Sequence, residues 1–265
     1  MDKVLVILHK EWLDLKQQRG LLLGILLPPL FLVLLPIGIL YGARFVPGGS
    51  LTNTNSLNSL VARLPALAGM TQQEAGQAIA GMQFSILFLL LPLMIPSIIA
   101  AYSIVGEKTS RTLEPVLATP VRTWELLLGK SLTALIPAVG LTWLVGGIYI
   151  AATAVLAVSP RVFAAIVTPG WLIILLLWSP LLTLIAIAAM TAISSRVNDP
   201  RTAQQFAAWA VVPFMALFFG QLTGLVVVGP VLTLGVFIVL IPIAILSIWG
   251  ATRLFQREVI LTRWK

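Results

Sequence analysis

Five long stretches of the chain contain no Asp, Glu, Lys or Arg, namely residues 20–43, 75–106, 131–160, 162–195 and 202–252. A membrane-spanning helix needs about 20 apolar residues. The last stretch is too long for one helix, because at about 1.5 Å per residue it would far exceed a hydrocarbon core about 30 Å thick. Glycine and proline are densest between Gly220 and Pro230, which places a turn there. We therefore predict six spans, over residues 21–43, 82–105, 131–158, 171–195, 206–228 and 230–252.

The runs are continuously apolar, which favours helices over the strands of a closed β-barrel, where lipid-facing and interior residues alternate. Composition agrees, since 59% of the 265 residues are hydrophobic and 10% are charged, against about 45–50% and about 25% in soluble domains. We therefore predict an all-α integral membrane protein formed by a single domain, residues 1–265. The chain has no cysteine, which excludes disulfides, thiolate catalysis and cysteine-ligated metal centres.

The 17 Lys and Arg residues fall unevenly on the two sides of the predicted bundle. Fourteen lie before span 1, between spans 2 and 3, between spans 4 and 5 and after span 6, and three lie in the other connections. Basic residues concentrate in cytoplasmic segments, so both termini are predicted to be cytoplasmic. The formal net charge of +8 is then explained by topology, and we expect no nucleic-acid partner.

Residues 1–19 are predicted to form an amphipathic helix along the cytoplasmic membrane surface. Its apolar stripe consists of Leu5, Leu8, Trp12 and Leu15, which recur at helical spacing. Its polar face consists of Lys3, Lys10, Asp14, Lys16 and Gln17. The alternative is a charged anchoring tail beside span 1.

Residues 44–81 form the longest predicted external segment, rich in Gly, Asn, Ser and Thr at its start. Thr71 and Glu74 have the spacing of a capping box, which predicts a helix near residues 71–81. The segment is thus either a small external subdomain or a disordered loop.

The predicted cytoplasmic segment 106–125 carries charges of both signs within twenty residues. Glu107, Arg111 and Glu114 are spaced to share one helical face, and Pro115 and Pro120 divide the segment into short pieces. A solvated loop that obeys the positive-inside rule would explain the basic residues but not the three glutamates. A docking surface for a cytoplasmic partner explains both.

The predicted spans contain no acid or base, which disfavours a self-powered proton pump or antiporter. His9 is the only histidine and cannot form a zinc or haem site alone. Gly129-Lys130-Ser131 is similar to the end of a phosphate-binding loop, but Trp124 occupies the position of its first glycine and no strand precedes it. We therefore expect no nucleotide-binding domain, metal or cofactor in this chain.

Small and hydroxyl residues inside the spans predict helix packing. Glycines at four-residue spacing allow close helix approach, either within the chain or between two copies, and they are Gly20, Gly24, Gly38, Gly42, Gly220 and Gly224. Ser179 and Thr183 share a face of span 4. Interhelical hydrogen bonds are their default role, and lining of a translocation path is the alternative.

The string EKTSRTLEPVLATPVR at residues 107–122 resembles the cytoplasmic signature E-K-x-x-x-T-L-E-P-[LV]-L-A-T-P-V of type-two ABC exporter permeases. This family includes sodium-efflux, drug, lantibiotic and polysaccharide export permeases. The HKEW string at residues 9–12, the Pro-containing first span, the six spans and the RLFQREVILTRW string at residues 253–264 also fit, so the resemblance covers essentially the whole chain.

The resemblance implies a dimer of two six-span subunits, homomeric or heteromeric, in the cytoplasmic membrane of a bacterium or archaeon. It implies that segment 106–125 contains a coupling helix seated in a cleft of a separate ATPase subunit, which would bind ATP and Mg²⁺. Residues implied to transmit the motion are Glu107, Arg111, Thr112, Leu113 and Glu114. A second, smaller contact would lie at residues 196–205, with Asp199 and Arg201.

Two other functions fit the same composition less well. A membrane-embedded structural or assembly subunit would need no ATPase partner. An intramembrane enzyme would need a histidine, cysteine or acid at membrane depth, and the predicted spans hold none.

Overall fold

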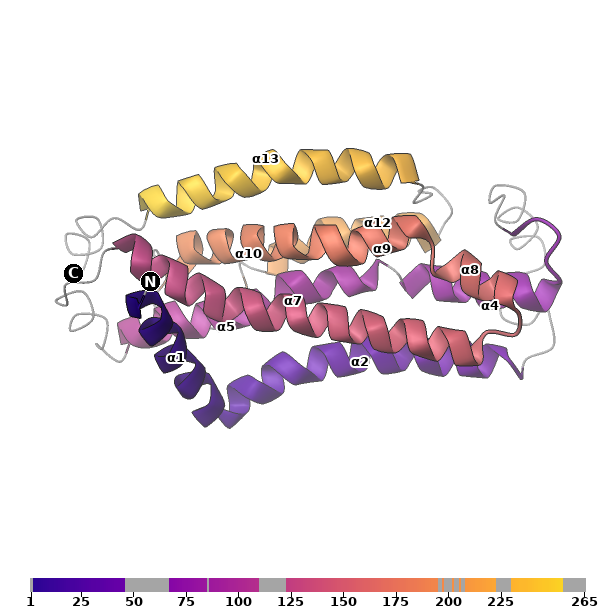
Figure 1. Cartoon of the computed structure of the whole chain (residues 1–265), viewed down its shortest axis with the longest axis horizontal. Coiled ribbons are helices and arrows are strands. Elements are labelled where there is room, and N and C mark those ends of the chain that lie inside the picture. Colours follow the sequence, from indigo (N-terminus) through magenta and orange to yellow (C-terminus); the bar gives the residue numbers. More distant parts are fainter. Residues whose placement is uncertain are drawn as a thin grey trace.

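In the computed structural model, the chain forms a bundle of long helices that run side by side along one axis (Figure 1). The structure describes residues 2–45, 67–84, 86–109, 123–194, 208–222 and 230–254, together with residues 197, 202 and 205. These residues contain helices and turns and no strand. The predicted all-helical class is therefore confirmed for this part of the chain.

Three helices are each long and apolar enough to cross a membrane by themselves: α2 (Arg19–Ala43), α7 (Thr123–Leu156) and α13 (Pro230–Leu254). Helix α2 continues through Pro28, Pro29 and Pro36, so these prolines do not divide it. Helix α7 begins eight residues before the predicted span at 131, and therefore includes Glu125 and Lys130.

Two further spans are composite. The second consists of α4 (Gln72–Phe84), η2 (Leu87–Leu90) and α5 (Leu91–Thr109). The fourth consists of α9 (Pro169–Ile173), the π-helical turn η3 (Ile174–Trp178) and α10 (Ser179–Ser194). The described residues thus contain five helical segments that are long and apolar enough to cross a membrane.

The fifth predicted span, 206–228, is described only in part. Its described residues form η4 (Trp209–Val211) and α12 (Val212–Leu222), and the apolar helix Val212–Gln221 falls short of membrane-spanning length. Of the predicted turn between Gly220 and Pro230, Gly220 still lies in α12, Pro230 begins α13, and residues 223–229 lie outside the described residues. A count of six spans therefore stays a prediction.

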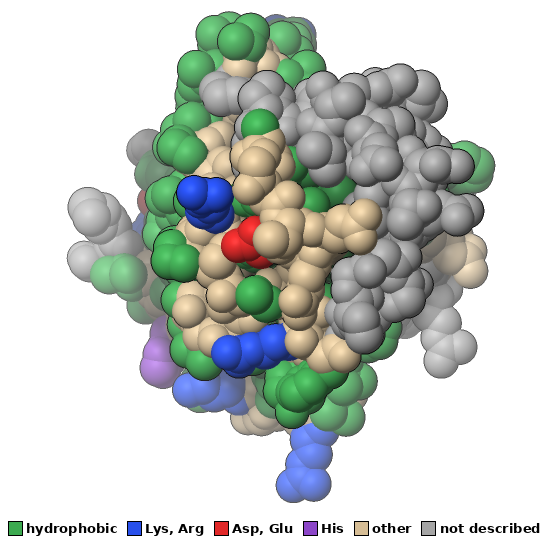
Figure 2. Space-filling model, turned by 90° about the vertical axis from the view of Figure 1, so that its right-hand side faces the viewer, with side chains coloured by type: hydrophobic (Ala, Val, Ile, Leu, Met, Phe, Trp, Pro, Cys, Tyr) green, Lys and Arg blue, Asp and Glu red, His purple; other side chains and the backbone are tan. Residues whose placement is uncertain are grey.

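The long helices run alternately in opposite directions, and their termini lie at the two ends of the bundle (Figure 1). Helix α1 (Asp2–Gln17) lies at one end, together with the start of α7 and the ends of α5, α10 and α13. We call this the α1 end. Seen from the opposite end, few charged side chains are visible among the hydrophobic and other uncharged ones (Figure 2), and many large hydrophobic residues of α2, α7 and α13 are exposed. This distribution is that of a bundle whose sides face lipid.

The opposite end contains the helix predicted after residue 71. The capping box is present, because the Thr71 backbone N–H donates to Glu74 Oε2 at 2.8 Å and the Glu74 N–H donates to Thr71 Oγ1 at 3.3 Å. Both bonds satisfy donors that the first turn of α4 leaves without helical partners. Residues 46–66 of the predicted external segment lie outside the described residues.

An additional short helix, α8 (Pro160–Ile166), follows α7 at this end and was not predicted. Ser159 and Pro160 are a suitable start for it, because proline fits the first helical position. The side chain of Gln77 in α4 forms three hydrogen bonds at this end of the bundle. Its amide donates to Leu40 O at 3.1 Å and to Leu156 O at 3.0 Å, and accepts from Val158 N at 2.9 Å.

An aromatic cluster fills the core between the second, third and fourth spans. The ring centroids of Phe88 and Tyr149 lie 5.1 Å apart, and Trp171 lies 5.8 Å from Tyr149 and 6.0 Å from Phe88. The Tyr149 hydroxyl donates to Gly81 O at 3.0 Å. This fully buried tyrosine therefore joins α7 to α4 by both packing and a hydrogen bond.

Candidate functional site

Helix α1 packs against the first turns of α7 at the α1 end. The helix predicted over residues 1–19 is present as α1, and its place on the membrane surface stays a prediction. Val4 and Glu11 are buried on α7, whereas Leu5, placed on the apolar stripe by its spacing, is 60% exposed. Helix α1 therefore has two apolar faces. The face with Val4 packs against the bundle, and the face with Leu5 is exposed. The spacing of apolar residues in the sequence identifies the exposed face more clearly.

Gly129 allows this close packing. A Cβ atom at Gly129 would lie 2.7 Å from Ile7 Cγ2, 3.0 Å from Ile7 Cβ and 3.5 Å from the Val4 carbonyl oxygen. Only a residue without a side chain admits α1 at this distance. Gly129 and its neighbour Lys130 are thus part of the contact between α1 and α7 rather than of a phosphate-binding loop.

Next to Gly129, three polar side chains from three helices form a buried network. Lys130 Nζ donates to Glu11 Oε1 at 2.8 Å and to Ser103 Oγ at 2.8 Å, and lies 3.3 Å from the Ser103 carbonyl oxygen. Ser103 Oγ donates to Glu11 Oε2 at 2.7 Å. Glu11 and Lys130 are only 4% and 6% exposed. We call these residues the Glu11–Ser103–Lys130 triad, in which each member bonds to the other two.

The triad keeps Glu11 ionised. Burial raises the pKa of Glu11, but the charge of Lys130 and the hydrogen bonds from Lys130 and Ser103 outweigh burial and hold it below its ordinary value of 4.5. A carboxyl group with a lowered pKa stabilises the folded state above its ordinary pKa. This stabilisation is therefore present at neutral pH and is lost only as the pH falls through the lowered value.

The triad lies close to the predicted coupling segment along both neighbouring helices. Ser103 is about two helical turns before Thr109, where α5 ends, and Lys130 is about two turns after Thr123, where α7 begins. Residues 110–122, which join the two helices, lie outside the described residues. The triad therefore contacts both helices that lead into this segment.

The structure describes the backbone of one predicted coupling residue. The backbone of Glu107 belongs to the last turns of α5. The other predicted contacts lie outside the described residues, and they are Arg111, Thr112, Leu113, Glu114, Asp199 and Arg201. Their role stays a prediction.

The predicted glycine pairs in α2 make no close helix contact within the described part of the chain. A Cβ atom at any of Gly20, Gly24, Gly38 or Gly42 would meet no atom within 4 Å. Gly220 lies in α12, and Gly224 lies outside the described residues. Packing of these glycines against a second copy stays a prediction.

The hydroxyl pair in span 4 has local hydrogen-bond partners. Ser179 Oγ donates to Leu175 O at 2.6 Å and accepts from Trp143 Nε1 of α7 at 3.0 Å. Thr183 Oγ1 donates to Ser179 O at 2.8 Å. The predicted interhelical bond is therefore present at Ser179, whereas the Thr183 hydroxyl bonds within its own helix.

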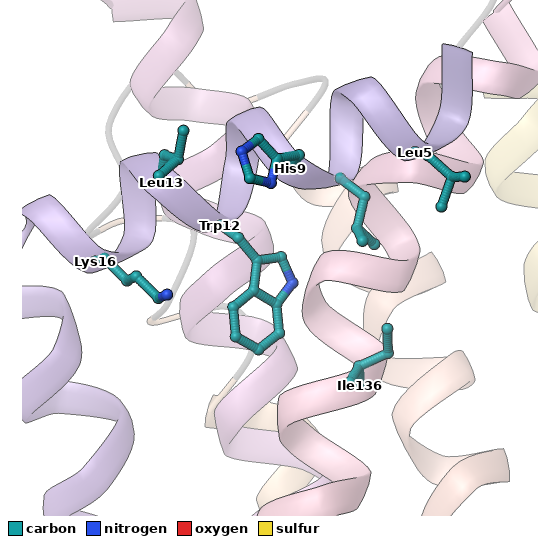
Figure 3. Close-up of a pocket in the computed structure, with 7 residues that line it drawn as sticks. Leu5, His9, Trp12, Leu13, Lys16 and Ile136 are labelled. Carbon is teal, nitrogen blue, oxygen red and sulfur yellow. The ribbon is translucent and has the colours of Figure 1, made fainter. Parts of the chain in front are cut away.

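A groove of about 490 Å³ lies beside α1, on the side away from the triad's hydrogen bonds. Figure 3 shows the Trp12 ring extending from α1 toward α7 and Ile136, with Lys16 and His9 among the residues that line the groove. The lining is mostly apolar, as expected for an interfacial helix whose outer side contacts lipid. Among the described residues, no three His, Asp or Glu side chains come together as metal ligands.

Sequence reasoning missed the triad, although one signal was available. Glu11 occurs at helical spacing after Val4 and Ile7, so it is an acidic residue on an apolar helix face. A buried acid needs a partner. Lys130 lies at the head of an apolar run, where the sequence explains its charge by topology and does not point to Glu11.

Apolar helices of membrane-spanning length, with an amphipathic helix packed at one end, define a polytopic α-helical membrane protein. The family model described as ABC-2 family transporter protein matches residues 5–239. The chain belongs to this family, and is therefore a transmembrane permease of an ABC transporter. Such permeases are normally non-catalytic membrane subunits. No curated protein matches the chain.

Proposed function

We propose that this permease forms the translocation path of an ATP-driven exporter and couples to a separate ABC ATPase through residues 106–125. The observation that carries the proposal is the position of the signature segment 107–122 in a chain of this family. It connects α5 and α7, which both end or begin at the α1 end of the bundle. Two long helices thus lead from this segment into the core.

The α1 end is the cytoplasmic end in this proposal, because the basic residues concentrate there. The partners are an ABC ATPase that binds ATP and Mg²⁺ and a second permease subunit. Closure of two ATPase subunits would draw the coupling segments together and rock the helix bundles against one another. Asp199 and Arg201 would add the second, smaller ATPase contact.

Purification of the chain in mild detergent from the membranes of its own cells tests the ATPase partnership. We expect an ABC ATPase to co-purify, and its hydrolysis rate to change when the permease is removed. A chain that recruits no ATPase, or one whose presence leaves hydrolysis unchanged, would instead fit the structural or assembly subunit.

Charge reversal at Glu114 tests the coupling segment. Loss of a desolvated charged contact typically costs about 2 kcal/mol or more, so Glu114→Lys should weaken ATPase binding roughly 30-fold. Membrane insertion should stay normal, because the variant loses an acid, which contributes little to topology, and gains a lysine in a segment already predicted to be cytoplasmic. The measurement is ATPase binding to the permease in nanodiscs.

The matched control is Asp14→Lys, which reverses an acid whose side chain is 48% exposed at the same end. It should leave ATPase binding unchanged. Equal binding by the Glu114→Lys variant and the wild-type chain would contradict a docking role for Glu114.

A further inference from the structure

Three helices from different parts of the bundle meet at the Glu11–Ser103–Lys130 triad. Helix α1 is amphipathic, α5 is the end of the second span, and α7 is the start of the third. Glu11 and Lys130 are 119 residues apart in sequence. The triad is thus a long-range connection between α1 and the two helices that flank residues 110–122.

The chemistry of the triad fixes orientation more strictly than apolar packing does. A buried ion pair pays a desolvation cost, and apolar residues of similar volume often give equal or greater stability. Hydrogen bonds, however, require specific distances and angles. All three triad members would lose a partner if either α5 or α7 slid along α1 or rotated against it.

We propose that Glu11 is a positioning residue that holds α5 and α7 in fixed register on α1, so that the three helices move as one body when the coupling segment moves. This inference rests on the proposed function. The ammonium group of Lys130 and the hydroxyl of Ser103 supply one contact from each helix, and the two carboxylate oxygens of Glu11 receive them separately. Motion that reaches either helix therefore also reaches α1.

The absence of cysteine allows a direct test by site-specific spin labelling. One label at Leu13→Cys on α1 is paired with a second at Trp124→Cys on α7 or at Tyr102→Cys on α5. These positions are 46%, 54% and 38% exposed. Distance distributions are measured by EPR spectroscopy on the full chain in nanodiscs. We expect one narrow distribution for each pair.

Glu11→Gln should broaden both distributions, because the amide has no charge opposite Lys130 and one acceptor oxygen in place of the two that Lys130 and Ser103 use. Ser103→Ala should broaden the α1–α5 distribution alone, since the bond between Glu11 and Lys130 remains. The exchanged variant, Glu11→Lys with Lys130→Glu, should restore both narrow distributions. Asp14→Asn, which changes a half-exposed acid that pairs with Lys10 of the same helix, should leave them unchanged.

A purely structural role would lower the yield or thermal stability of the Glu11→Gln variant but leave both distances narrow in the folded protein. That result overturns the inference, as does failure of the exchanged variant to restore the distances. Either result leaves the proposed function intact, because ATPase binding by the wild-type chain is a separate measurement.

The second part of the test uses the co-purified ATPase. The Glu11→Gln variant should still bind the ATPase, but the effect of the permease on ATP hydrolysis should be lost and then return in the exchanged variant. Normal regulation by Glu11→Gln overturns the inference alone. A wild-type chain that binds no ATPase overturns the proposed function, and with it the coupling role of Glu11.

Discussion

Valine in place of Gly129 is expected to detach α1 from the bundle. The added Cβ would lie 3.0 Å from Ile7 Cβ, an atom fixed to the α1 backbone, so a change of rotamer cannot relieve the contact. Overpacking of this kind costs about 1–3 kcal/mol. Displacement of α1 would also separate Glu11 from Lys130.

Cysteine labelling measures this detachment. Val4 is 9% exposed against α7, so a Val4→Cys thiol should react slowly with a maleimide in the otherwise cysteine-free chain. If Gly129→Val destabilises the docked state by about 2 kcal/mol, labelling should become roughly 30-fold faster. Gly140→Val is the matched control, because a Cβ at Gly140 of the same helix meets no atom within 4 Å. Equal labelling rates in the two variants would show that α1 does not depend on close approach at Gly129.

Removal of the Tyr149 ring is the second change expected to have a large effect. The side chain is fully buried between Phe88 and Trp171. Truncation of a buried aromatic residue to alanine costs about 3–5 kcal/mol through lost packing and the cavity that remains. Tyr149→Phe keeps the ring and loses only the bond to Gly81 O, and a hydrogen bond between membrane helices averages about 0.6 kcal/mol.

Unfolding of both variants in mixed micelles separates the two contributions. We expect Tyr149→Ala to lose several times more unfolding free energy than Tyr149→Phe. Tyr102→Ala serves as the control, because Tyr102 is 38% exposed and its ring adds little to the core. Similar losses for Tyr149→Ala and Tyr149→Phe would mean that the hydroxyl, rather than the aromatic cluster, holds the spans together.

The predictions that succeeded rest on local physics. Charge-free runs identify helices that need lipid, and the spacing of Thr71 and Glu74 identifies a helix start, because both hydrogen bonds of a capping box form within four residues. The start of α7 was placed eight residues too late for a related reason. The predicted span begins where the apolar run begins, at residue 131. The helix begins earlier, and its first turns include Glu125 and Lys130.

The triad depends on tertiary contacts that no local pattern specifies. The charge on Glu11 indicates that a partner is needed, but only the packing of α1 on α7 selects Lys130, 119 residues away. The π-helical turn at Ile174–Trp178 is likewise invisible to periodicity. It accompanies tertiary contacts such as the bond from Trp178 Nε1 to Thr233 O at 3.2 Å.

The separation of Glu11 from Lys130 along the chain also has a consequence for biosynthesis. Chains emerge from the ribosome amino-terminus first, so Glu11 is already at the membrane when Lys130 leaves the ribosome. Lys130, about two turns into α7, therefore leaves the ribosome after its counter-ion has been made. Deletion of the first 17 residues would remove this counter-ion together with α1. An expression strategy that trims the amino terminus would thus leave the buried Lys130 without Glu11, whereas an affinity tag at the carboxyl terminus would leave this contact in place.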